Sequence, residues 1–173
     1  MKQIIITLIL ALTIPLASAA LGAEGVKFGS VDIQKVLILS DAGKEAKEQL
    51  AGKANKIEGE KSSREEELKK LKAELERQNV VLADDARKAK EQNFMQKRKE
   101  LDRFLKDAQE EIQAKNDELT NRIVDEVVKI IQEYGRKNGY TIIFVKNEGM
   151  IYVDEKADLT DEVLKAFNAA RKK

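Results

Sequence analysis

The residues best suited to a chemical role lie between positions 80 and 99, in the stretch VVLADDARKAKEQNFMQKRK. From position 87 to position 106, eight basic residues stand against three acidic ones, giving a local net charge of +5. Methionine adapts its shape to varied partners, and positive charge attracts acidic chains or anionic head groups. The pattern therefore predicts a contact surface for unfolded acidic chains, with an anionic membrane surface as a further candidate partner. The candidate contact residues are Val80, Val81, Leu82, Arg87, Lys88, Lys90, Phe94, Met95, Lys97, Arg98 and Lys99.

A simpler interpretation of the same stretch also stands. Phe94 and Leu82 would then only close the end of a helical hairpin, and the lysines would form a solvated face.

Catalysis is not expected of this chain. It contains no cysteine and no histidine, which removes thiol chemistry, the usual general base and the commonest transition-metal ligand. No glycine-rich phosphate-binding loop occurs, and no pair of carboxylates stands out as an acid and a base. We therefore expect no enzyme, no metal and no cofactor. A formal net charge of +1 over 173 residues also gives no argument for a nucleic-acid partner.

The first 19 residues have the layout of a secretory signal peptide. Lys2 precedes an apolar run of 13 residues from position 4 to position 16, and small residues follow at Ala17-Ser18-Ala19. We expect cleavage after Ala19 or Ala20 and export of the remaining chain. The alternative is an uncleaved N-terminal anchor, although the run is short for a membrane span of about 20 residues.

Residues 41–138 are expected to form a long helical hairpin that turns near 83–85. Apolar residues recur at alternating spacings of three and four in both halves, which is typical of one narrow helical stripe. Asp84 or Asp85 is suited to cap the second helix. One continuous helix in a parallel coiled coil is the alternative. The stripe residues are Ala46, Leu50, Ala54, Ile57, Leu68, Leu71, Leu75 and Leu82, then Phe94, Leu101, Leu105, Ala108, Ile112, Leu119 and Ile123.

Two features vary along this hairpin. Residues 59–64 interrupt the stripe with Gly59 and charged residues, so we expect a flexible stretch that stays helical. Near the end of the second helix the stripe widens from position 123 to position 131, which predicts that this end enters a core.

The two flanking segments, residues 20–40 and 139–173, are expected to form one small β-rich body. Strands are predicted at 26–30, 140–145 and 150–153, the last two joined by a tight turn at 146–149. Asp32 is suited to cap a short helix, Gly139 to end the long one, and Thr160 to begin a terminal helix. The fold class is therefore α+β, a β-rich body with a helical hairpin arm. The body residues are Val26, Phe28, Val31, Ile142, Ile143, Phe144, Val145, Ile151 and Val153.

A body of about 60 residues with two or three strands is marginal alone. Self-association would supply the missing apolar contact, so we expect a homo-oligomer with arms projecting from its centre.

Three stretches resemble the Skp/OmpH family of periplasmic chaperones: GSVDIQKVL near the N-terminus, LADDARKAKEQ at the turn, and GYTIIFVKNEGMIYVDEKADLTDEVLKAFN at the C-terminus. This resemblance implies a homotrimer whose strands build a shared β-barrel-like body. Three arms would enclose unfolded outer-membrane β-barrel proteins without ATP. The enteric member of the family is markedly basic, whereas this chain without residues 1–19 has 31 basic and 31 acidic residues.

Two other functions fit the same pattern. A coiled-coil spacer or adaptor of the cell envelope would bind one folded partner tightly and ignore unfolded chains. A peripheral binder of membranes or envelope polymers would act through the basic tip and would bind vesicles in a salt-sensitive way.

Overall fold

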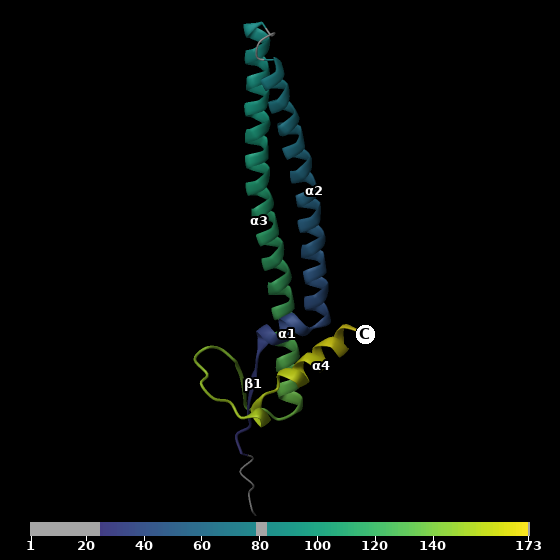
Figure 1. The fold of residues 1–173 in the computed structure, drawn as a ribbon. Coiled ribbons are helices and arrows are strands. Elements are labelled where there is room, and N and C mark those ends of the chain that lie inside the picture. The colour runs from purple at the N-terminus through teal and green to yellow at the C-terminus, as the bar shows by residue number, and fades with distance from the viewer. Residues whose placement is uncertain (1–24, 79–82, 173) are drawn as a thin grey trace, which may run out of the picture.

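The computed structural model describes residues 25–78 and 83–172. The expected signal peptide lies outside this range. Along the chain the elements are β1 (Phe28–Val31), α1 (Ile33–Leu39), α2 (Asp41–Gln78), α3 (Asp84–Lys137), β2 (Ile142–Val145), the 3₁₀ turn η1 (Glu155–Ala157) and α4 (Thr160–Arg171). Helices α2 and α3 lie side by side as a long arm, and the other elements gather at its base (Figure 1). The α+β fold class is confirmed.

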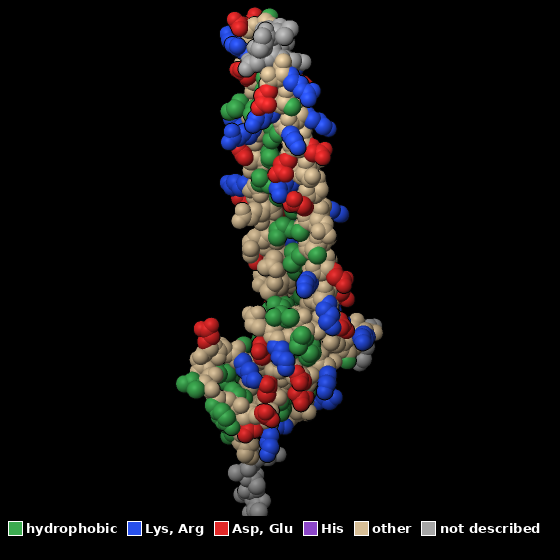
Figure 2. Space-filling view, viewed as in Figure 1, with side chains coloured by type: hydrophobic (Ala, Val, Ile, Leu, Met, Phe, Trp, Pro, Cys, Tyr) green, Lys and Arg blue, Asp and Glu red, His purple; other side chains and the backbone are tan. Residues whose placement is uncertain are grey.

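The arm is an antiparallel hairpin, as predicted. Ion pairs join Lys53 to Glu111, Glu67 to Lys97 and Glu74 to Lys90, so residue numbers rise on α2 as they fall on α3. With 38 and 54 residues, the helices are about 57 Å and 81 Å long at 1.5 Å per residue. The line of contact between α2 and α3, here called the seam, shows hydrophobic side chains between rows of charged ones (Figure 2).

The seam changes character along the arm. Near the body it is apolar, with Ala46 and Leu119 buried. Farther out, ion pairs cross it, and the Arg64 guanidinium lies 4.5 Å from the centre of the Phe104 ring. Residues 59–64 stay helical, as expected. The placement of Leu105 on the stripe was wrong, because Leu105 is exposed while Phe104 is half-buried.

The body joins the two ends of the chain through a parallel pair of strands. β1 pairs with β2 in the register Phe28↔Ile142 to Val31↔Val145, and the whole arm lies between the two strands in sequence. One face of the sheet packs on α3 and α4. The core joins β1, α1, the base of the arm and α4, and the widened stripe of α3 enters it through Ile123 and Val127, as predicted.

The predicted second strand at 150–153 was wrong. Its tight turn is present, since Met150 N donates to Asn147 O at 3.0 Å, but residues 150–153 have no strand partner in the part of the chain described. The chain instead passes to the other side of β1, where Asp158 forms a bridge with Ser30. β1 therefore has a neighbour on each side, and the outer edge of β2 has none among the described residues.

Three predicted helix ends are confirmed. The Asp32 side chain accepts from Lys35 N at 2.8 Å and caps α1. Gly139 follows α3 with φ of 69°, a conformation that glycine adopts without strain. Helix α4 begins at Thr160. The capping role expected of the two aspartates was wrong, because Ala83 is the N-cap of α3 and no side chain caps it; the aspartates lie in its first turn.

Candidate functional site

The basic stretch predicted as a contact surface divides into two faces of α3. Arg87, Lys90, Phe94 and Lys97 recur at spacings of three and four and are all half-buried. They continue toward the body through half-buried Leu101 and Phe104, so this row faces the seam. These four side chains thus lie along the seam and are only partly exposed to solvent.

Ion pairs across the seam account for two of these basic residues. Lys97 Nζ lies 3.1 Å from Glu67 and 3.6 Å from Glu100, while Lys90 Nζ lies 3.3 Å from Glu74. The hydrogen bond and charge of Glu67 raise the pKa of Lys97 above its ordinary value, so this side chain stays charged throughout the neutral range.

The remaining residues of the stretch form an outward face. Lys88, Met95, Arg98 and Lys99 are exposed, and Met95 has 49% of its surface accessible. None of the three cations makes an ion pair with any residue between 25–78 or 83–172. A shallow hollow of about 570 Å³ lies along this face. It is lined by Lys88, Glu91, Gln92, Met95, Gln96 and Lys99.

The structure therefore brings together on one outward face four of the eight predicted contact residues that it describes. Val80, Val81 and Leu82 lie outside the described residues. The division was present in the sequence, because the seam spacing of three and four runs unbroken from Arg87 to Ala108. Counting charges along the linear sequence does not reveal this division into two faces.

The predicted body residues also divide by face. Val31 is fully buried in the core and Ile143 packs against it. Phe28, Ile142 and Phe144 lie on the opposite face of the sheet, where all three are about half exposed and the two phenylalanine rings stack at 6.3 Å. This group is here called the open sheet face. Val26, Val145 and Ile151 are also exposed, although Val145 pairs with Val31 on the core side of the sheet, and Val153 is half-buried.

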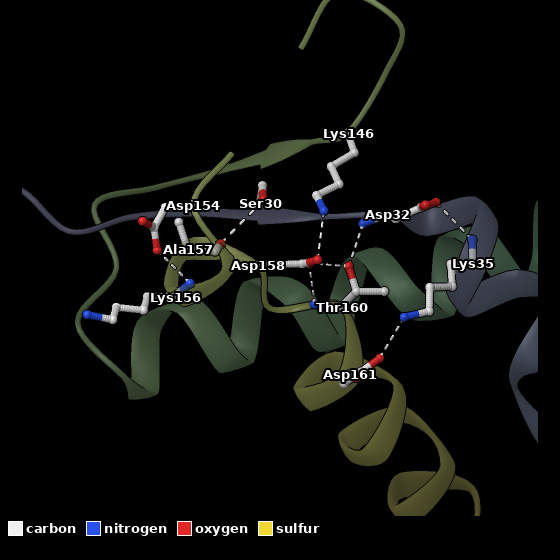
Figure 3. A network of polar contacts seen from close by, with 10 residues as sticks. All are labelled: Ser30, Asp32, Lys35, Lys146, Asp154, Lys156, Ala157, Asp158, Thr160 and Asp161. Carbon is white, nitrogen blue, oxygen red and sulfur yellow. Dashed lines mark hydrogen bonds and ion pairs between the residues drawn. The ribbon is translucent and has the colours of Figure 1, made fainter. Parts of the chain in front are cut away.

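A polar network fixes the chain where it returns to the body (Figure 3). Asp158 accepts from Lys146 Nζ at 2.7 Å and from the Thr160 hydroxyl at 2.5 Å, and that hydroxyl accepts from Asp32 N at 3.0 Å. Partial burial raises the pKa of Asp158, but the bonds from Lys146 and Thr160 outweigh it and hold the pKa below the ordinary value of 3.8. Ion pairing with Asp161 attaches Lys35 of α1 to the start of α4.

Two chemical possibilities have no support among the described residues. No group of three or more aspartates, glutamates, histidines or cysteines is placed to hold a metal ion there. No helix in that part of the chain is long and apolar enough to cross a membrane.

Together, these features define a protein with a long helical hairpin on a small α+β body, whose outward surfaces suit binding. A family model described as "Outer membrane protein (OmpH-like)" matches residues 27–167, and the chain belongs to this family. The family resemblance found in the sequence is confirmed.

Two known proteins are similar to this chain. An uncharacterized protein of Aquifex aeolicus (strain VF5) is 30% identical over 141 residues, covering 82% of this chain and 85% of that protein. The crystal structure of a candidate outer membrane chaperone (OmpH-like) from Caulobacter crescentus CB15 matches with a TM-score of 0.78 and 18% identity. It covers 83% of this chain and 84% of that one, which shows a shared fold.

Proposed function

We propose that this protein is a periplasmic holdase chaperone: it binds unfolded outer-membrane β-barrel proteins between several helical arms and prevents their aggregation without ATP. The observation that carries the proposal is the outward face of α3, where three cations without ion pairs to described residues flank exposed Met95. The similar Caulobacter protein, a candidate outer membrane chaperone, agrees with the proposal.

The outward face suits weak, general binding better than recognition of one folded partner. The hollow along it is shallow, and its lining mixes two cations, one carboxylate, two amides and one flexible thioether. Such a surface offers hydrogen bonds, positive charge and adaptable apolar contact to chains of many sequences. It has no deep apolar pocket of the kind that fixes a single ligand.

Several arms acting together would compensate for weak individual contacts. Linked binding surfaces raise the effective concentration around a bound chain, so that avidity exceeds the affinity of each site. The open sheet face supplies a reason for copies to assemble, because large apolar side chains exposed next to one another mark interaction sites. We therefore propose a homo-oligomer, with a trimer implied by the family resemblance.

The test is light scattering while a urea-denatured outer-membrane β-barrel protein is diluted into buffer containing the protein without its first 19 residues and without nucleotide. We expect aggregation to be suppressed near a one-to-one ratio of client to assembled protein. Unchanged scattering across a wide molar excess would refute the holdase function and favour the spacer or adaptor function.

A matched pair of variants tests the outward face. Replacing Lys88, Arg98 and Lys99 by glutamine should weaken suppression several-fold, and added salt should weaken the wild type in the same direction. The control replaces Lys56, Lys69 and Lys70 of α2 by glutamine, which removes the same charge from exposed positions elsewhere on the arm. Equal loss in both variants would show that net charge, not this face, matters.

Contact with an anionic membrane is a second candidate function, favoured by the same three exposed cations. Each basic residue near an anionic surface contributes about 1 kcal/mol. Cosedimentation with vesicles containing anionic lipid would then fall in the triple variant of α3 and stay unchanged in the α2 control.

A further inference from the structure

The loop between β2 and η1 carries the two most exposed large apolar side chains of the described residues. Ile151 is 99% accessible and Tyr152 is 81% accessible. In Figure 1 this loop projects to one side of the body, away from α4. Its tip is therefore displayed to solvent rather than packed on its own chain.

The base of this loop is firmly held. Lys146 N donates to Val31 O and Leu159 N donates to Ser30 O, both at 2.8 Å, so both ends of the loop are attached to β1. A side-chain ion pair between Lys146 and Asp158, at 2.7 Å, also joins the two ends of the loop. A loop anchored in this way presents its tip in a restricted range of positions, which lowers the entropic cost of binding through it.

A shallow, open pocket of about 280 Å³ lies elsewhere on the same body, between the last turns of α3 and strand β2. It is lined by Ile131, Gln132, Gly135, Arg136, Tyr140 and Ile143. Ile143 packs closely against Gly135 in this wall, since a Cβ on Gly135 would lie 3.1 Å from the Ile143 side chain. A cavity of about 150 Å³ holds a benzene ring, so this pocket has room for the phenol ring of Tyr152.

The loop and the pocket are complementary in charge. The loop carries Glu148, Asp154 and Glu155 against the single cation Lys156, while Lys146 is engaged by Asp158. The pocket is rimmed by Arg136, with Lys137 beside it. Within the described residues, no ion pair uses any of the three loop carboxylates or the two α3 cations. Complementary charge of this kind orients partners at an interface.

We propose that Tyr152 and Ile151 of one copy occupy the Ile131–Tyr140–Ile143 pocket of the next copy, with Glu148 facing Arg136. The high exposure of Tyr152 shows that it does not fill the pocket of its own chain. Because loop and pocket are different surfaces, the contact is head-to-tail, and repetition by a rotation closes a ring. Gln132 supplies a hydrogen-bond partner for the buried tyrosine hydroxyl. This inference rests on the proposed function, since it assumes that copies assemble.

The first test is photo-crosslinking in a mixture of isotope-labelled and unlabelled copies, with p-benzoylphenylalanine in place of Tyr152. We expect crosslinks to peptides containing residues 131–136, joining labelled to unlabelled chains. The same amino acid in place of Leu105, an exposed arm position, should not reach those peptides. Crosslinks only within one chain, or between copies but to other segments, would overturn the proposal.

The second test exchanges the charges at the contact and measures the mass of the assembly by sedimentation. Arg136→Glu alone and Glu148→Arg alone should each weaken assembly at least about tenfold, because like charges would meet at every contact. The double variant should recover assembly, since each contact would again pair opposite charges. Lys165→Glu on α4 makes the same charge change as Arg136→Glu and should leave the mass unchanged. No recovery in the double variant would contradict the contact.

These measurements distinguish a failure of the loop–pocket contact from a failure of the proposed function. If the wild type sediments as a single chain, the proposed oligomer is itself wrong. If it is assembled and suppresses client aggregation, but crosslinks and charge exchange fail as described, only the loop–pocket contact is wrong.

Discussion

Phe94 and Met95 are neighbours in sequence but differ in environment. Phe94 is half-buried in the seam, whereas Met95 is exposed and lines the outward hollow. The helical repeat of 3.6 residues places consecutive side chains about 100° apart, so one residue can stabilise the arm while the next meets a partner. Under the proposed function, stability and binding would depend on different residues of the same cationic stretch.

Phe94→Ala should lower the free energy of unfolding of the arm by about 1–2 kcal/mol, less than for a fully buried aromatic residue, because only part of the ring leaves water. Met95→Ala should change stability by less than about 0.5 kcal/mol and should weaken suppression of client aggregation. Urea denaturation followed by circular dichroism measures the first effect, and light scattering the second. The reverse assignment, with Met95→Ala destabilising and binding intact, would contradict this division.

Asp158 makes stability depend on pH in the acid range. Its pKa is held below 3.8 in the folded protein, so the folded state binds its proton less readily than the unfolded chain does. Its stabilising contribution is therefore fully present above about pH 4 and is lost as the pH falls through the lowered value.

Asp158→Asn should be less stable than the wild type at pH 7, and the difference should shrink as the pH falls below about 4. Urea denaturation at a series of pH values measures it. Asp102→Asn is the control, because Asp102 is exposed on the arm and makes no ion pair with a described residue. A stability difference for Asp158→Asn that does not vary with pH would contradict the ion-pair explanation.

At the scale of the elements, local sequence patterns predicted the helices and helix ends, because these depend on residues that are close together in the chain. The alternating spacing of three and four gave both arm helices, and Asp32 and Gly139 marked helix ends correctly. The parallel pairing of β1 with β2 joins residues 114 positions apart, and no local pattern encodes it. The strand wrongly predicted at 150–153 has the residue types of a strand but has no pairing partner within the single copy. Composition was enough to locate the cationic stretch of the candidate site. Separating its seam-facing residues from its outward residues requires the helical periodicity of α3.

Gly59 is an element-scale feature of α2. A Cβ at this position would meet nothing within 4 Å, so packing does not require glycine there. Gly59→Ala should therefore raise the stability of the arm by about 1 kcal/mol, the usual difference between alanine and glycine inside a helix. If residues 59–64 act as a hinge, Gly59→Ala combined with Lys61→Leu and Arg64→Leu should also narrow the range of client sizes held.

Gly43→Ala should have the opposite effect on stability to Gly59→Ala, because a Cβ on Gly43 would lie 1.7 Å from Leu37 O and should destabilise the junction of α1 with α2.

The range of client sizes is measured by scattering assays with outer-membrane proteins of different strand number. An unchanged client range in the triple variant, despite a stiffer arm, would exclude the hinge.

At the scale of the whole molecule, exposed apolar surface is concentrated at the body. Of the large apolar residues that are exposed, seven belong to the strands, the segment before β1 or the loop after β2, and two belong to α1. Only Met95 and Leu105 lie on the described part of the arm. The body is thus the part of the molecule that would gain most from the proposed association.

Phe144→Asp should dissociate the assembly, because it places a charge on the open sheet face, where burial against another copy would leave that charge unpaired. Leu105→Asp is the matched control, a similarly exposed apolar residue replaced by the same charge on the arm, and should keep the assembled mass. Sedimentation gives the mass, and circular dichroism checks that the arm stays helical. The dissociated variant should then hold clients poorly even though its outward face is intact, because single arms lose the gain in effective concentration. Full client holding by a monomeric Phe144→Asp variant would show that one arm suffices and that assembly serves another purpose.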